Sequence, residues 1–242
     1  MSFANRTNFA LQALGMFVNN VVMLALWWLF FEGFKSVAGW QRADVALLMG
    51  ITMTIVGICG VFCGGYRDLA ATVLRGELDP LLTQPKALLP RLLAKESMAT
   101  AWGDLIGGPL LLVWFVNLTL AQVPLLFIAL IAGAIVFLGA AIAFASMAFW
   151  AAGARSFARE LVDFTILFST YPGSIYQGAL RVVAYTLLPA GFIVMLPIEF
   201  VHAPTLGNLL VMGAGTLVYA SFALALFRVG LARYRRGSSP QT

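Results

Sequence analysis

The sequence predicts an all-α, polytopic membrane protein of about six transmembrane helices. The chain has 242 residues, of which 61% are hydrophobic and only 10% are charged. Soluble domains have roughly 45–50% apolar and about 25% charged residues. The apolar residues form several long runs, and a membrane-spanning helix needs about 20 of them. These runs lack the weak alternation that is typical of barrel strands. We therefore expect a single transmembrane domain over residues 1–242.

Five apolar runs are candidate spans. They cover Phe9–Phe31, Val45–Gly65, Met98–Asn117, Pro124–Ala151 and Leu206–Phe227. The first run ends in Trp and Phe residues, which indicate a membrane interface. The second is rich in glycine, at Gly50, Gly57, Gly60 and Gly64. Since small residues let helices approach closely in lipid, we expect the glycine face to pack on a neighbouring helix.

A broken, re-entrant region is predicted at about residues 161–201, before the last span. Pro172-Gly173, Pro189 and Pro197 interrupt its apolar character. One interpretation is a fifth span at about Leu161–Tyr171, followed by half-helices that dip back from the outer face. The other is an interfacial Ser156–Ala179 followed by a crossing at Arg181–Phe200. Breaks at membrane depth are tolerated only against protein or a watery cavity, so both interpretations place this region at a functional surface.

The most informative segment is polar and rich in turns, at about residues 66–97. Residues 68–74 can form a short helix, which Gly76 would end because glycine readily takes the left-handed conformation. Pro80 suits the first turn of a second short helix, whose apolar face would be Leu78, Leu81 and Leu82. Such an amphipathic element can lie on lipid or bind in a groove of a partner protein.

Basic residues predict the orientation. They concentrate in this polar segment, at Arg155 and Arg159, and in the C-terminal tail. Short loops rich in Lys and Arg face the cytoplasm, so we expect these segments and both termini to be cytoplasmic. The links near Lys35, Leu118 and His202 would then face outside. The net charge of +5 reflects this topology and does not suggest nucleic acid as a partner.

Few residues point to chemistry within the chain. We predict no catalytic or metal site: Cys59 and Cys63 are too few for a closed metal site and are expected to be packed in the core. No Gly-rich phosphate loop ending in Lys-Ser or Lys-Thr is present. Asp104 is an acid within a span, and such acids usually face protein or water. It could contact a cationic substrate, carry a proton, or pair locally.

A second charged cluster contains Arg155, Arg159, Glu160 and Asp163. Its spacing favours a helix at the membrane boundary, with basic side chains that reach the interface and ion pairs within the helix. A contact with a partner protein is the alternative interpretation.

Several sequence features resemble those of bacterial ABC exporter permeases of the ABC-2 type. The specific motif is Gly76-Glu77-Leu78-Asp79, with Leu81-Leu82 and Gln84-Pro85. Other matching features are Asn19-Asn20, Trp27-Trp28, Phe30-Phe31, Gly103-Asp104 and Tyr171-Pro172. The resemblance runs over nearly the whole chain. It implies a multi-pass protein of the bacterial cytoplasmic (inner) membrane, which forms a translocation path as a dimer with a second copy or a related permease.

The resemblance also implies a separate ABC ATP-binding subunit, which would hold ATP and Mg²⁺, whereas this chain would bind no cofactor. We name residues 75–85 the coupling turn. The residues implied in coupling are Arg75, Gly76, Glu77, Leu78, Asp79, Leu81, Leu82, Gln84 and Pro85, with Arg155, Arg159 and Glu160 as a possible second contact. The resemblance does not identify the residues of the substrate path, for which Asp104 is a candidate. The alternatives are an intramembrane lipid-modifying enzyme and a scaffold subunit that transports nothing.

Overall fold

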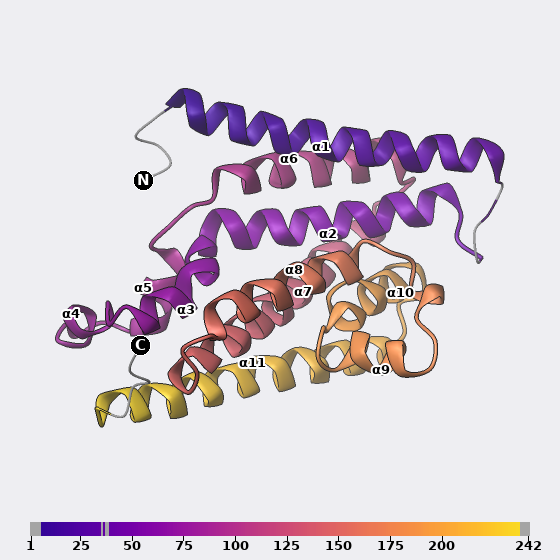
Figure 1. Cartoon of the computed structure of the whole chain (residues 1–242). Coiled ribbons are helices and arrows are strands. Elements are labelled where there is room, and N and C mark those ends of the chain that lie inside the picture. The colour runs from indigo at the N-terminus through magenta and orange to yellow at the C-terminus, as the bar shows by residue number, and fades with distance from the viewer. Residues whose placement is uncertain (1–5, 35, 37–38, 238–242) are drawn as a thin grey trace.

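A computed structural model shows a bundle of helices (Figure 1). It describes residues 6–34, 36 and 39–237, so Lys35 and the extreme termini lie outside the described residues. The chain is 81% helical and the described part contains no strand. The predicted all-α class is confirmed.

Four helical stretches of the described residues are long and apolar enough to cross a membrane. They are α1 (Arg6–Gly33), Arg42–Leu74, Gln122–Phe149 and α11 (Leu206–Arg235). The helices α5 (Leu88–Ala94) and α6 (Ala99–Phe115) are bent by 83° at their break and give a fifth span if they are taken together. The structure therefore supports four or five spans, and the predicted number of about six is not confirmed.

The second stretch reaches from the apolar interior into the polar segment without interruption. It joins α2 (Arg42–Cys63), the 3₁₀ turn η2 (Gly64–Asp68) and α3 (Leu69–Leu74). Most of it is buried by other helices, whereas α1 and α11 at the two edges of the bundle are mostly exposed (Figure 1). The stretch is thus the central element, and α3 is continuous with α2.

Close packing between α2 and α6 depends on the glycines of α2. A Cβ added to Gly57 would lie 2.4 Å from the backbone nitrogen of Leu105, and one added to Gly60 would lie 2.4 Å from Cβ of Ala101. Gly50 meets Leu112 in the same way. The predicted glycine face is confirmed, and its neighbour is the third apolar run.

α7 (Gln122–Ser146) lies between α2 and α11 and continues into the 3₁₀ turn η3 (Met147–Phe149), which contacts α3 and α11. The broken region follows α8 (Ala154–Ser169). Its elements are η4 (Gly173–Ile175), α9 (Ala179–Tyr185), the π-helical turn η5 (Gly191–Met195) and α10 (Leu196–His202). Residues 181–200 are therefore divided among three elements and do not form one crossing helix.

The C-terminus of α8 lies beside the middle of α2, where its last carbonyls need partners. The hydroxyl of Thr52 donates to the carbonyl of Ser169 at 2.7 Å, and the hydroxyl of Tyr176 donates to the carbonyl of Phe168 at 2.8 Å. Both donors are side chains of the same chain. The end of α8 is thus stabilised by hydrogen bonds from side chains of this protein.

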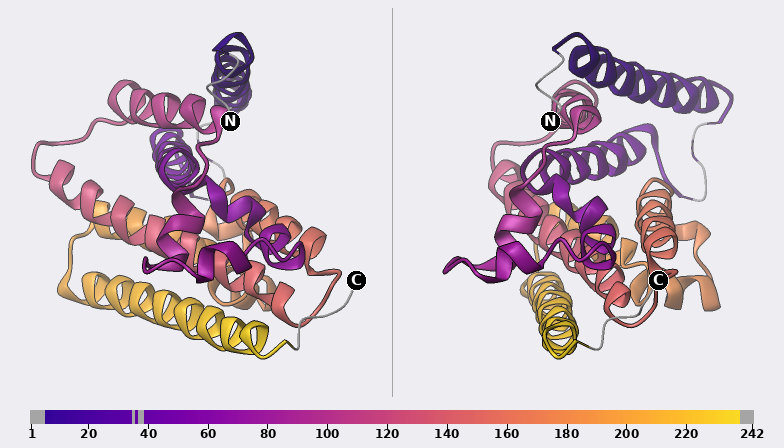
Figure 2. Two further views of the ribbon diagram at one scale, coloured as in Figure 1. Left: turned by 90° about the vertical axis from the view of Figure 1, so that its left-hand side faces the viewer. Right: turned by 60° about the vertical axis from the view of Figure 1, so that its left-hand side comes forward.

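One end of the bundle carries most of the positive charge. The start of α1, the short helices α3 to α5 and the end of α11 lie together there, and α9 and α10 lie at the other end (Figures 1 and 2). Of the described Lys and Arg residues, all except Arg42 and Arg181 belong to segments at this end. We refer to it as the basic end.

Candidate coupling site

The coupling turn begins where α3 ends. Gly76 has φ of +71°, in the left-handed region. The N–H of Gly76 donates to the carbonyl of Val73 at 3.2 Å, and the N–H of Glu77 donates to the carbonyl of Thr72 at 3.1 Å. These two hydrogen bonds form a Schellman cap, which satisfies the last carbonyls of the helix. The prediction that Gly76 ends the helix in this conformation is confirmed.

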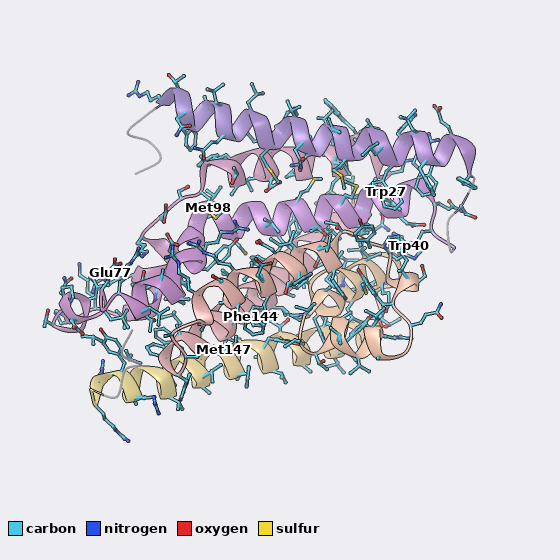
Figure 3. All side chains as sticks on the ribbon, viewed as in Figure 1. Trp27, Trp40, Glu77, Met98, Phe144 and Met147 are labelled. Carbon is cyan, nitrogen blue, oxygen red and sulfur yellow. The ribbon has the colours of Figure 1, made fainter. Side chains whose placement is uncertain are left out.

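The second short helix is α4 (Asp79–Leu82), with Pro80 in its first turn as predicted. Leu78 is completely buried, and Leu81 and Leu82 are partly buried against the main core. The expected apolar face exists, but it packs on this chain. A partner would therefore meet the exposed side of the turn, which carries Glu77 (Figure 3).

Both acids of the turn have partners within the chain. Glu77 Oε1 lies 2.7 Å from Nε of Arg75, and the hydroxyl of Tyr234 donates to Oδ1 of Asp79 at 2.9 Å. Tyr234 lies in the last turns of α11, so this hydrogen bond joins the turn to the C-terminal helix. Each of the two acids is therefore held in place by a side chain of this chain.

Further hydrogen bonds fix the rest of the turn. Nη2 of Arg91 in α5 donates to Oε1 of Gln84 at 2.7 Å. Nζ of Lys95 donates to Oγ1 of the buried Thr72 at 2.7 Å. Pro85 is exposed beside Gln84. The coupling turn is therefore attached to α3, α5 and α11, and it presents a defined polar surface.

The second charged cluster packs beside this site. Arg159 of α8 forms an ion pair with Asp68, and Asp163 lies 2.6 Å from Nη2 of Arg67. These pairs join α8 to η2, so the prediction of pairs within the helix is wrong for Arg159 and Asp163. Arg155 and Glu160 are exposed on the same helix. They lie close enough in sequence to Arg159 to share its end of the bundle.

Asp104 lies apart from the coupling turn, inside α6. Its residue is only 4% exposed, and Oδ1 accepts a hydrogen bond from Nδ2 of Asn20 in α1 at 2.7 Å. The partner is thus on another helix, 84 residues away, and not a local cap.

Cys59 is buried and Cys63 is half-buried, both as free thiols. Among the described residues, no group of three or more His, Cys, Asp or Glu could hold a metal ion.

A family model described as ABC-2 family transporter protein matches residues 17–238. The chain belongs to this family. No curated protein and no solved structure matches it. The match covers the coupling turn, α8 and α11 together, whereas the start of α1 before residue 17 lies outside it. This ABC-2-type permease is therefore a membrane-spanning transport component.

Sequence reasoning missed three residues of the site. Tyr234 lies in a C-terminal tail whose sequence indicates only its positive charge, and no motif marks Arg67 and Asp68 among the charges of the polar segment. No periodic pattern marks a contact between residues 155 positions apart, such as Tyr234 and Asp79. Arg67 and Asp68 connect the polar segment to α8, and Tyr234 connects it to α11.

Proposed function

We propose that this permease is the membrane subunit of an ATP-driven exporter, and that a separate ATP-binding subunit docks on the coupling turn. The observation that carries the proposal is the construction of the turn. It is exposed and polar, yet a Schellman cap, an ion pair and the Tyr234 hydrogen bond hold its shape. These contacts hold the exposed polar side chains in one arrangement, which suits a docking surface.

The orientation follows from the charges of the basic end. Cytoplasmic loops carry the excess of Lys and Arg, so the basic end faces the cytoplasm of a bacterial inner membrane, with both termini on that side. α8 then starts at the cytoplasmic face and reaches mid-membrane, and the irregular chain after Ser169 completes a sixth crossing. The exposed apolar faces of α1 and α11 face lipid and a second permease, which is either an identical copy or a related chain.

The coupling turn is linked to two parts of the membrane domain. α3 is continuous with α2, and α2 packs on α6 through its glycines. Asp79 is joined to the end of α11. A force on α4 is therefore transmitted by contacts between helices, as a coupled motion requires. ATP and Mg²⁺ would bind to the partner subunit, and binding would favour one arrangement of these helices over another.

Purification of the tagged permease from its native membrane in mild detergent tests this proposal. We expect a soluble ATP-binding subunit to co-purify in stoichiometric amount. Because the two acids shape the exposed surface, Glu77→Lys with Asp79→Lys should abolish co-purification and coupled ATPase activity while the permease still folds. Glu199→Lys, an exposed acid at the opposite end, is the matched control and should change neither. A permease that is recovered alone, or a double variant that transports normally, would refute the proposal.

A further inference from the structure

A cleft lies beside α8, between this helix and the pair formed by α1 and α6. It is lined mainly by small and apolar residues from these helices and from α2, including Met16, Val56, Met98 and Ile166. It reaches from the basic end to Thr170, where α8 has ended. We refer to it as the α8 cleft. Its position next to a broken helix is where the sequence predicted a functional surface.

Three charged side chains line the α8 cleft: Arg67, Asp104 and Asp163. Arg67 and Asp163 form an ion pair with 2.6 Å between Nη2 and Oδ1. Within the described residues, Asp104 has no cationic partner, since its one hydrogen bond comes from the neutral amide of Asn20. The cleft thus contains one carboxylate without a counter-charge.

Asp104 is buried, but its side chain still lines the α8 cleft. No side chain or backbone group of the described residues donates a hydrogen bond to its second oxygen, Oδ2. Among the described residues, Ser174 Oγ is the one side-chain atom that is both fully buried and without a hydrogen bond. Oδ2 is therefore accessible from the cleft. A carboxylate in such a place is costly unless a cation or a proton accompanies it, because the surrounding helices exclude most of the water.

We propose that the α8 cleft binds amphiphilic cargo with a cationic headgroup, with the cation at Oδ2 of Asp104 and the apolar part against the methionine and aliphatic side chains. This inference deepens the proposed transport function. It rests on that function because a ligand of the cleft is cargo only if the permease transports it. The charge of Asp104 decides the sign of the headgroup, and the lining of the cleft decides the apolar character of the remainder. The side chain of Asn20 holds Oδ1, which leaves Oδ2 as the oxygen that can accept a ligand.

Binding of two probes of the same shape and opposite charge tests this inference. Radiolabelled tetraphenylphosphonium and tetraphenylborate would be dialysed against the purified full-length permease, with empty detergent micelles subtracted. Asp104→Asn removes the charge and keeps an oxygen acceptor for Asn20. We expect it to weaken phosphonium binding about tenfold, which is about 1.4 kcal/mol, and to leave borate binding unchanged. Asp104→Glu should retain phosphonium binding, and Glu199→Gln, which removes a distant negative charge, should have no effect.

Equal binding of phosphonium to the wild type and to Asp104→Asn would overturn the inference, as would a wild type that binds no phosphonium. If Asp104→Asn fails to fold, the wild type and Asp104→Glu test the inference. Both must bind tetraphenylphosphonium more tightly than tetraphenylborate. The result is separate from that of the proposed function, because probe binding needs no ATP-binding subunit. Co-purification of that subunit without a preference for the cation would refute the cargo class alone.

Discussion

The contact between α2 and α6 gives a prediction whose magnitude follows from geometry. A Cβ at position 57 would lie 2.4 Å from the nitrogen and 2.7 Å from Cα of Leu105, whereas ordinary contacts of Cβ begin at 3.4 Å. The two helices would have to separate by roughly 1 Å, since both atoms belong to the backbone. Overpacking of this kind typically costs about 1–3 kcal/mol. We therefore expect Gly57→Ala to lower the free energy of unfolding by that amount.

Unfolding of the purified permease by SDS, followed by tryptophan fluorescence, measures this loss. Gly15→Ala in α1 is the matched control, because a Cβ there meets no atom within 4 Å. It should leave the free energy of unfolding unchanged or raise it slightly, since alanine is the better helix former. If Gly57→Ala is as stable as Gly15→Ala, the two helices do not pack through glycine and the central position of α2 is wrong.

Three further substitutions test individual contacts. Tyr234→Phe removes the hydroxyl that donates a hydrogen bond to Asp79. We expect faster amide hydrogen exchange in residues 76–82 and weaker ATPase coupling with an intact fold. Unchanged exchange would contradict this. Arg159→Ala breaks the exposed ion pair with Asp68 and should cost about 0.2–1 kcal/mol of unfolding free energy, less at high salt; a loss that is independent of salt would argue against the pair. Thr52→Val removes the donor to the last carbonyl of α8 and should cost about 0.6 kcal/mol, the average for such hydrogen bonds in a membrane protein; no loss in SDS unfolding would mean that α8 ends elsewhere.

Features set by local sequence could be predicted. The apolar runs predicted the long helices, because the length of a run decides whether a helix can span. Gly76 and Pro80 predicted the end of α3 and the start of α4, since each residue restricts its own backbone. The glycines of α2 predicted a close neighbour, although not which helix it would be.

Features set by tertiary packing could not be predicted. The direction of the Leu78 side chain depends on the core that α3, α5 and α11 build, so an amphipathic pattern alone did not separate a docking face from an internal one. Asn20 and Asp104 meet because α1 packs on α6, and no spacing records this. The course of residues 161–201 depends on Thr52 and Tyr176, which stabilise the end of α8 beside the middle of α2.

Site-specific photo-crosslinking in the native membrane tests the central claim most directly. A benzoylphenylalanine at Thr83, exposed in the coupling turn, is compared with one at Leu120, which is 91% exposed in the link between α6 and α7 at the opposite end. The account predicts that Thr83 crosslinks to one soluble ATP-binding subunit and that Leu120 does not. Crosslinks from Thr83 to lipid alone, or to the subunit from Leu120, would contradict the assignment of residues 75–85 as the docking site.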